Sequence, residues 1–257
     1  MLGGTGVMGR EILGNIDTTV HRVTITSRRA RTSDNSNVQY VQVNAKNLDE
    51  LKKLLTHRYD VIVDYLVYAT KEFEARYELL LSNTDQYIFI SSARVYAQSD
   101  DLITEETPRL LDVSTDKEYL ATDEYALCKA RSENLLYQSG KTNFTVVRPS
   151  ITFGPYRLQL GVFEKEQWLY RALHGRSVVF SHDIATKRTT ATLGADVARG
   201  IAALAGQKEA LGETFHITSE ISYLWQEVLD CYVRVLQEEL GRDIPVVMTE
   251  TDRKAHV

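Results

Sequence analysis

Short runs of β-branched and other apolar residues alternate along the chain with longer stretches in which apolar residues recur at helical spacing. The runs that predict strands in the first part of the chain cover 20–26, 38–43, 60–64, 87–91 and 144–148. The stretches that predict helices there cover 48–55, 73–81 and 124–137. Strands and helices in alternation are typical of a parallel sheet with right-handed crossovers. The pattern therefore predicts an α/β fold with a doubly wound parallel sheet.

In the second half of the chain the pattern becomes looser. Helical spacing recurs at 162–173 and 195–205, and a further strand-like run lies at 214–218. We expect residues 1–150 to form one domain, and residues 151–257 to form a smaller lobe that partly returns to the sheet.

The two ends of the sequence lead to a further expectation about missing residues. Only Met1 and Leu2 precede a glycine-rich turn, whereas a strand at the centre of a sheet needs about four or five residues. We expect residues to be missing upstream. The stretch 245–248 also ends as though a further helix should follow.

The glycine-rich turn has the pattern G-x-x-G-x-x-G, with Gly3, Gly6 and Gly9 at the start of an expected helix. Glycine at the first two positions permits positive φ and removes side chains that would block a diphosphate, and the third lets the helix approach the sheet closely. Glycine clusters also form ordinary surface turns, which is the alternative. If the turn binds a dinucleotide, residues 1–150 are the dinucleotide-binding domain. The residues expected to contact the dinucleotide are then Gly3, Thr5, Gly6, Val7, Met8 and Gly9.

The end of the second expected strand indicates which dinucleotide is bound. NAD-binding proteins of this fold class place an acidic residue there, but this chain has Ser27 and Arg28, followed by Arg29. The Ser27 hydroxyl can bond a 2′-phosphate, and the Arg28 guanidinium can pair with that phosphate or stack on adenine. We predict NADP as the cofactor, with NAD as the alternative. If these residues instead form only a solvated basic turn, they indicate no preference between the two cofactors.

Tyr125 and Lys129 are four residues apart and therefore share one face of an expected helix. A nearby ammonium favours the phenolate and lowers the tyrosine pKa from its usual value of about 10, so the phenol can serve as an acid or a base. In a chain with this many tyrosines and lysines, such a pair also arises by chance. Tyr137 and Lys141 repeat the spacing, but Gly140 near the expected helix end disrupts their shared face.

A hydroxyl upstream distinguishes the first pair from the second. The strand pattern at 87–91 ends in Ser91 and Ser92, at the sheet edge where doubly wound proteins bind ligands. Ser92 can donate a hydrogen bond to a substrate oxygen while Tyr125 exchanges its proton, so that a hydride moves between a carbon and a nicotinamide. The alternative is that the two serines only begin a turn.

Composition argues against several other classes of protein. With 30 Lys and Arg against 35 Asp and Glu, the net charge of -5 makes nucleic acid an unlikely main partner. No apolar run has the length of a membrane span and the start lacks the order of a signal peptide, so we expect a cytoplasmic protein. We predict no metal site, because no two of the six histidines have the spacing of a metal-binding pair. We expect Cys128 and Cys231 to be free thiols.

Several motifs follow one another in a set order: the glycine turn, Ser91-Ser92-x-x-Val95-Tyr96, Tyr125 with Lys129, Val147-Arg148-Pro149 and Phe153-Gly154-Pro155. As a set they resemble the extended short-chain dehydrogenase/reductase superfamily, in particular its NAD-dependent epimerase/dehydratase family. The resemblance covers nearly the whole chain and implies a Rossmann fold. It also implies roles for single residues: Ser92, Tyr125 and Lys129 as the catalytic trio, Pro149 with its backbone facing the nicotinamide, and Asn44 and Ala45 near the adenine.

The chain also departs from the family pattern, chiefly around the expected substrate. Where relatives carry His-x-Ala-Ala after the fourth strand this chain has 65–69, including Tyr68, which alters the wall of the active site. The acid and base pair of the sugar 4,6-dehydratases is replaced by Ala93 and Arg94, so that reaction is not expected. Arg188 lies near the position of a phosphate-binding arginine, with a solvated surface arginine as the alternative. Tyr68, Arg94 and Arg188 are the expected substrate-binding residues.

Together the motifs predict an NADP-dependent epimerase or reductase that moves a hydride at a hydroxyl or keto carbon, with a nucleotide sugar as a candidate substrate. The alternative from another class is a non-catalytic protein of the same fold that senses a dinucleotide or binds RNA, as chloroplast relatives do. The Tyr-x-x-x-Lys pair and the acidic balance count against it. The resemblance further implies a homodimer through the helices at 73–81 and 124–137.

Overall fold

The computed structural model describes residues 1–250, and the chain divides into two compact units. The first unit contains Met1–Ser150 and Gly194–Ile217. The second contains Ile151–Leu193 and, among the described residues, 218–250. Among residues 1–250, every helix is too short or too polar to cross a lipid bilayer.

A parallel sheet forms the centre of the first unit. Its strands, in the order in which they pair, are β10 (Thr214–Ile217), β5 (Phe144–Pro149), β4 (Thr84–Ile90) and β3 (Tyr59–Asp64). A parallel pair, β1 (Val23–Ser27) and β2 (Val38–Gln42), continues it through the first two residues of the chain. The Leu2 amide donates to the Val63 carbonyl at 2.8 Å and the Thr26 amide donates to the Met1 carbonyl at 3.0 Å. Met1 and Leu2 thus occupy the place of a strand between β1 and β3.

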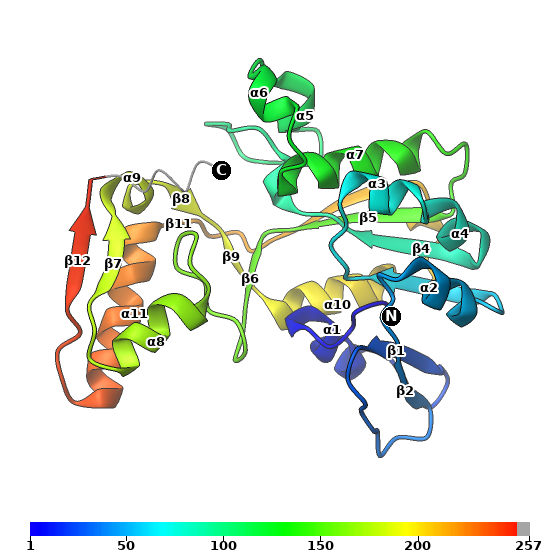
Figure 1. Ribbon diagram of the computed structural model, residues 1–257, viewed down its shortest axis with the longest axis horizontal. Coiled ribbons are helices and arrows are strands. Elements are labelled where there is room, and N and C mark those ends of the chain that lie inside the picture. The colour runs from blue at the N-terminus through cyan, green and yellow to red at the C-terminus, as the bar shows by residue number, and fades with distance from the viewer. Residues whose placement is uncertain (251–257) are drawn as a thin grey trace. The chain divides into compact units, whose positions relative to one another are not determined.

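Helices cover both faces of this sheet (Figure 1). One face packs against α2 (Leu48–Leu54), α3 (Thr70–Glu74), α4 (Tyr77–Ser82) and α7 (Tyr125–Tyr137). The other packs against α1 (Val7–Glu11), the 3-10 turn η1 (Ile12–Asn15) and α10 (Gly194–Leu204). Alternate residues of β4 point to opposite faces of the sheet. Tyr87 and Phe89 pack in the core on the first face, and Ile88 and Ile90 pack in the core on the second. The predicted doubly wound α/β fold is confirmed.

One predicted helix is wrong in its extent. The stretch 73–81 forms two short helices, α3 and α4, because the chain turns at Ala75 and Arg76. The Arg76 side chain is buried and donates back to the Glu72 carbonyl at 2.6 Å, while its guanidinium carbon lies 4.4 Å from the centre of the Tyr68 ring. Because the Arg76 side chain is drawn into the core, residues 73–81 do not form the single helix with a continuous apolar face that the sequence pattern predicted.

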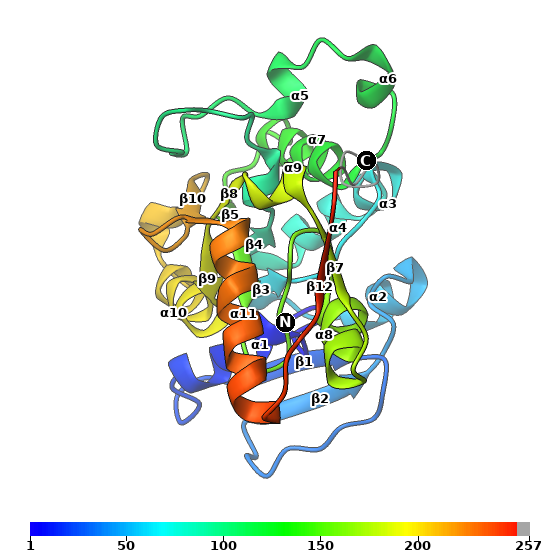
Figure 2. The same ribbon diagram turned by 90° about the vertical axis from the view of Figure 1, so that its left-hand side faces the viewer.

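The second unit has its own core, in which α8 (Lys165–Leu173) and α11 (Trp225–Leu240) pack against a parallel pair, β7 (Val178–Ser181) and β12 (Val246–Thr249). Figure 2 shows α11 beside this pair. Trp168 stacks on Tyr232 with ring centres 4.7 Å apart, which ties the two helices together. The remaining strands of this unit form two further pairs: β6 (Ile151–Phe153) with β9 (Ala191–Leu193), and β8 (Arg188–Thr189) with β11 (Tyr223–Leu224).

Several further helical elements are short. They are η2 (Ala93–Val95), α5 (Leu110–Val113), α6 (Lys117–Leu120) and η3 (Lys208–Ala210) in the first unit, and α9 (His182–Ala185) in the second. Of these, η2 begins three residues after the carboxyl end of β4, with Ser91 and Ser92 between the two elements.

Candidate active site

The glycine turn brings the backbone of the first residues against the start of α1. Gly3 has a φ of 68°, a conformation that favours glycine, and its amide donates to the Thr26 hydroxyl at 2.9 Å. A Cβ on Gly9 would lie 2.6 Å from the Gly4 backbone, so only glycine permits this close packing. A Cβ on Gly6 would meet no atom within 4 Å. The turn is therefore tightly packed on its inner side and open at Gly6.

Thr5, Val7 and Met8 lie within or beside this turn. The Thr5 carbonyl accepts a hydrogen bond from the Arg10 side chain at 2.8 Å, which fixes the outer part of the turn. Met8 packs against the core beneath α1. Thr5 and Met8 thus hold the turn in shape, and any contact of Thr5, Val7 or Met8 with a dinucleotide stays a prediction.

The residues predicted to contact the adenosine end lie at the carboxyl ends of β1 and β2. The Ser27 hydroxyl accepts the Arg29 amide at 3.2 Å, and Arg28 is exposed. The Asn44 side-chain oxygen accepts the Lys46 amide at 3.3 Å, while Ala45 is buried. The two strand ends are adjacent because Ser27 pairs with Gln42 in the parallel ladder.

Tyr125 and Lys129 occupy the first two turns of α7. The Lys129 ammonium is buried and its Nζ lies 6.0 Å from the centre of the Tyr125 ring, which is itself 39% exposed. Nζ donates to the Ile90 carbonyl at 2.7 Å and to the Leu66 carbonyl at 3.4 Å. These two hydrogen bonds hold Lys129 at the carboxyl ends of β4 and β3. Tyr125, whose ring is partly exposed, lies one helical turn before it.

Ser92 follows β4 by two residues and caps η2, where its hydroxyl accepts the Arg94 amide at 3.2 Å. The Ile90 carbonyl that holds Lys129 is thus two residues before Ser92. Burial lowers the pKa of Lys129 to about 8, because a charged ammonium is poorly solvated there. The structure places Ser92 and Lys129 at one strand end, with Tyr125 presented from the same helix as the lysine.

A model of the NAD-dependent epimerase/dehydratase family matches residues 1–218. The chain belongs to this family. Its members are enzymes, so the chain is identified as an enzyme, and the family supports a nicotinamide cofactor. The resemblance inferred from the motifs is thereby confirmed. No curated protein gave a match.

Solved structures share the fold of this family member. An epimerase from Methanothermobacter thermautotrophicus has a TM-score of 0.73 at 18% identity, over 98% of this chain and 79% of that chain. UDP-glucuronic acid 4-epimerase from Bacillus cereus, in complex with UDP-glucuronic acid and NAD, has a TM-score of 0.71 at 17% identity, over 97% and 85%. dTDP-glucose 4,6-dehydratase from Bacillus anthracis str. Ames, in complex with NAD, has a TM-score of 0.70 at 18% identity, over 98% and 84%.

The sequence prediction missed a buried carboxylate in this family member. Glu133, fully buried one turn beyond Lys129, accepts the Ser91 hydroxyl at 2.6 Å. It also accepts Nε and Nη2 of Arg148 at 2.9 and 2.8 Å, and Nη1 of Arg109 at 3.0 Å. Burial alone would lower the pKa of Arg148, but the bonds to Glu133 outweigh burial and raise that pKa. A charged residue four positions after Lys129, together with an arginine inside the apolar run of β5, was the signal that could have revealed it.

A second buried carboxylate lies at the end of β3. Asp64 accepts the Tyr68 and Tyr87 hydroxyls at 3.0 and 2.9 Å and the Leu66 amide at 3.0 Å. Burial raises the pKa of Asp64, and these hydrogen bonds oppose that rise. This carboxylate fixes the Leu66 segment whose carbonyl meets Lys129.

The three residues expected to bind substrate have different surroundings. Tyr68 is buried with its hydroxyl bonded to Asp64, so it belongs to the core, and the expectation of substrate contact is not supported there. Arg94 is exposed and pairs with Glu124 at 3.2 Å. Arg188 lies in the second unit, where it is exposed and donates to the Ser222 hydroxyl at 3.3 Å. Roles for Arg94 and Arg188 stay predictions.

The second Tyr-x-x-x-Lys pair does not come together. The Tyr137 hydroxyl bonds the Thr214 hydroxyl at 2.6 Å, and the Lys141 ammonium donates to the Ser82 hydroxyl at 3.0 Å. Their partners lie on different elements because α7 ends at Tyr137.

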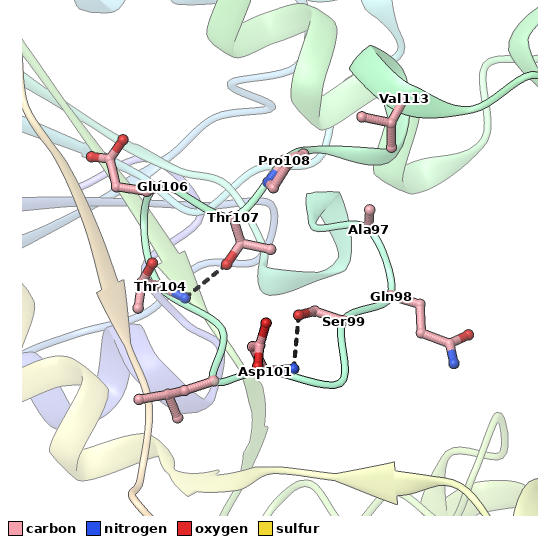
Figure 3. A pocket seen from close by; sticks show the side chains of 10 residues that line it. Ala97, Gln98, Ser99, Asp101, Thr104, Glu106, Thr107, Pro108 and Val113 are labelled. Carbon is pink, nitrogen blue, oxygen red and sulfur yellow. Dashed lines mark hydrogen bonds between the residues drawn. The ribbon is translucent and has the colours of Figure 1, made fainter.

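A pocket of about 420 Å³ lies on the loop that follows η2 (Figure 3). Its lining mixes apolar residues such as Leu102 and Val113 with polar ones such as Asp101 and Thr107. The Thr107 hydroxyl accepts the Thr104 amide at 2.9 Å, which shapes the loop. None of the predicted site residues lines it.

Proposed function

We propose that this enzyme is an NADP-dependent epimerase or reductase that transfers a hydride at a hydroxyl or keto carbon of a nucleotide sugar. The observation that carries the proposal is the buried Lys129 ammonium, 6.0 Å from the Tyr125 ring centre and bonded to the Ile90 carbonyl just before Ser92. A phenol, an ammonium and a hydroxyl at the carboxyl end of a Rossmann strand suit proton transfer coupled to hydride transfer.

Each of the three residues has a defined task in this proposal. Ser92 donates a hydrogen bond to the substrate oxygen and orients it. When the carbon is oxidised, Tyr125 as phenolate accepts the hydroxyl proton, and when it is reduced, Tyr125 returns that proton to the oxygen. The Lys129 ammonium stabilises the phenolate through its charge. A bound nicotinamide supplies the acceptor or donor of the hydride.

The residues of the first unit fit a dinucleotide. The space at Gly6 is open where a diphosphate needs to approach the backbone, and Gly3 adopts the conformation that such a turn requires. Ser27 and the exposed Arg28 stand at the end of β1 where NAD-binding proteins carry a carboxylate. These two side chains support NADP over NAD because they can meet a 2′-phosphate.

Two alanine variants of the glycine turn are expected to separate cofactor binding from folding. Gly6→Ala should weaken NADPH binding at least about tenfold, since its methyl group enters the diphosphate space, yet change the free energy of unfolding by less than about 1 kcal/mol. Gly9→Ala should lower that free energy by about 1–3 kcal/mol through its clash with Gly4. Denaturant unfolding and calorimetric NADPH titration measure both effects. Unchanged NADPH affinity in Gly6→Ala would show that the dinucleotide lies elsewhere.

Arg28→Ala is expected to reduce NADPH affinity by about tenfold or more while leaving NADH affinity unchanged, because only NADPH carries the 2′-phosphate. Arg22→Ala is the matched control, since Arg22 is equally exposed but precedes the opposite end of β1. Titration of both nucleotides into the three proteins measures the effect. Tighter binding of NADH than NADPH to the unaltered chain would overturn the NADP assignment.

The reaction itself is tested with NADP⁺ or NADPH and a panel of UDP- and dTDP-linked sugars, with the sugar products followed by NMR. Inversion at one carbon without net change in NADPH identifies an epimerase, and an equal change in sugar and NADPH identifies a reductase. Conversion of small carbonyl compounds but of no sugar nucleotide would refute the proposed substrate class.

A further inference from the structure

Two successive turns of α7 hold two consecutive residues at the end of β4. Lys129 donates from Nζ to the Ile90 carbonyl at 2.7 Å, and Glu133 accepts the Ser91 hydroxyl at 2.6 Å. Ser92 is the next residue along the chain. The spacing of the strand end relative to α7 is therefore set by two short hydrogen bonds, one on each turn of the helix.

Glu133 is itself held firmly. Its carboxylate forms a two-point contact with Arg148 on β5 and a third bond with Arg109, and it is fully buried. The Ser91 amide donates to the Val147 carbonyl at 2.7 Å, so the same strand end is also paired with β5. A carboxylate fixed by three guanidinium bonds leaves its remaining partner, the Ser91 hydroxyl, little freedom to move.

We propose that Glu133 is a positioning residue of this enzyme. By holding Ser91, it keeps the end of β4 in register with α7. This register fixes the Lys129 ammonium beside Tyr125 and places the Ser92 hydroxyl on the adjoining strand end. The inference rests on the proposed function in that Ser92, Tyr125 and Lys129 are taken as the reacting groups.

A purely structural role for Glu133 gives a different expectation. Loss of the ion pairs would then lower stability without changing the surroundings of Lys129 in the folded protein. Ser91→Ala separates the two roles, because it removes the hydrogen bond to the strand end and leaves both arginines paired with Glu133. Ser132→Ala is the matched control: Ser132 is equally buried, and its hydroxyl donates only to the Cys128 carbonyl within α7 at 2.8 Å.

The experiment follows the ionisation of Lys129 by NMR of ¹³C-labelled lysine side chains during a pH titration. Each variant is compared with the same variant carrying Lys129→Met, so that the difference reports Lys129 alone. Neither substrate nor cofactor is needed. Glu133→Gln, Ser91→Ala, Ser91→Thr and Ser132→Ala are titrated beside the unaltered chain, with thermal unfolding to establish that each is folded.

Release of the strand end should let the Lys129 ammonium leave its buried position and reach water. In Ser91→Ala and Glu133→Gln we expect the midpoint of Lys129 ionisation to rise by about half a pH unit or more, since burial is what lowers the pKa of Lys129 to about 8. Ser91→Thr keeps a hydroxyl and should restore the original midpoint. Ser132→Ala should leave the midpoint unchanged. If Glu133→Gln fails to fold, Ser91→Ala decides the result.

An unchanged midpoint in folded Ser91→Ala would overturn the inference, and so would an equal rise in Ser132→Ala. Failure of the proposed function is recognised separately, by turnover that survives Tyr125→Phe. The midpoint can rise as expected even in that case, because the titration requires no catalysis.

Discussion

Tyr125→Phe is expected to lower turnover by about two to four orders of magnitude, which is the usual contribution of a general acid or base. The variant removes the only group in the proposed trio that exchanges a proton with the substrate. The Tyr125 ring is 39% exposed and the phenylalanine keeps its shape, so NADPH affinity and the free energy of unfolding should stay nearly the same. Steady-state kinetics with the sugar nucleotide identified by the panel measures the loss.

Tyr137→Phe is the matched control for this variant. It makes the same chemical change at the other end of α7, where the hydroxyl bonds Thr214 on β10. Turnover should stay close to that of the unaltered chain. Equal turnover in Tyr125→Phe and Tyr137→Phe would remove Tyr125 from the mechanism and favour a non-catalytic use of the dinucleotide.

Glu133→Ala is expected to lower the free energy of unfolding by about 3–5 kcal/mol, because it leaves guanidinium charge buried without its carboxylate. Arg148 is the more affected partner, since its side chain is only 5% exposed and two of its bonds end on Glu133. Arg109 keeps a second carboxylate, Asp112, at 2.7 Å. Urea unfolding followed by circular dichroism measures the change.

Asp85→Ala provides the comparison for a surface ion pair. Asp85 meets Arg58 at 2.6 Å, but both side chains are more than half exposed. The expected loss is at most about 1 kcal/mol, because water screens the charges. A loss in Glu133→Ala no larger than that in Asp85→Ala would mean that water reaches the arginines once the carboxylate is removed.

Much of the scaffold could be predicted from the sequence because its signals are local. The strand at 87–91 was visible as an apolar run and is observed as β4, Thr84–Ile90. The helix at 124–137 was visible through its apolar spacing and is observed as α7. The glycine pattern likewise predicted a close approach, and the geometry of Gly9 against Gly4 shows one.

The parts that were missed depend on partners far away in the sequence. Nothing near Glu133 in the chain shows that its carboxylate meets Arg148 and Ser91. Tyr68 was expected to face a substrate, but the hydroxyl is taken by Asp64, a carboxylate that the sequence shows only as a strand residue. Arg76 broke a predicted helix for the same reason, because its buried contacts lie outside that helix. Pairing of buried charges is a tertiary property that periodicity does not report.

The bonds of Lys129 also bear on how the chain acquires its chemistry during folding. Its carbonyl partners are 39 and 63 residues away along the chain, whereas the backbone hydrogen bonds of α7 join residues only four apart. Distant contacts form after the intervening chain has been brought together, which is the slower process. On refolding from denaturant, helical circular dichroism is therefore expected to recover ahead of the Lys129 ionisation signature, and an intermediate rich in helix would be chemically inert.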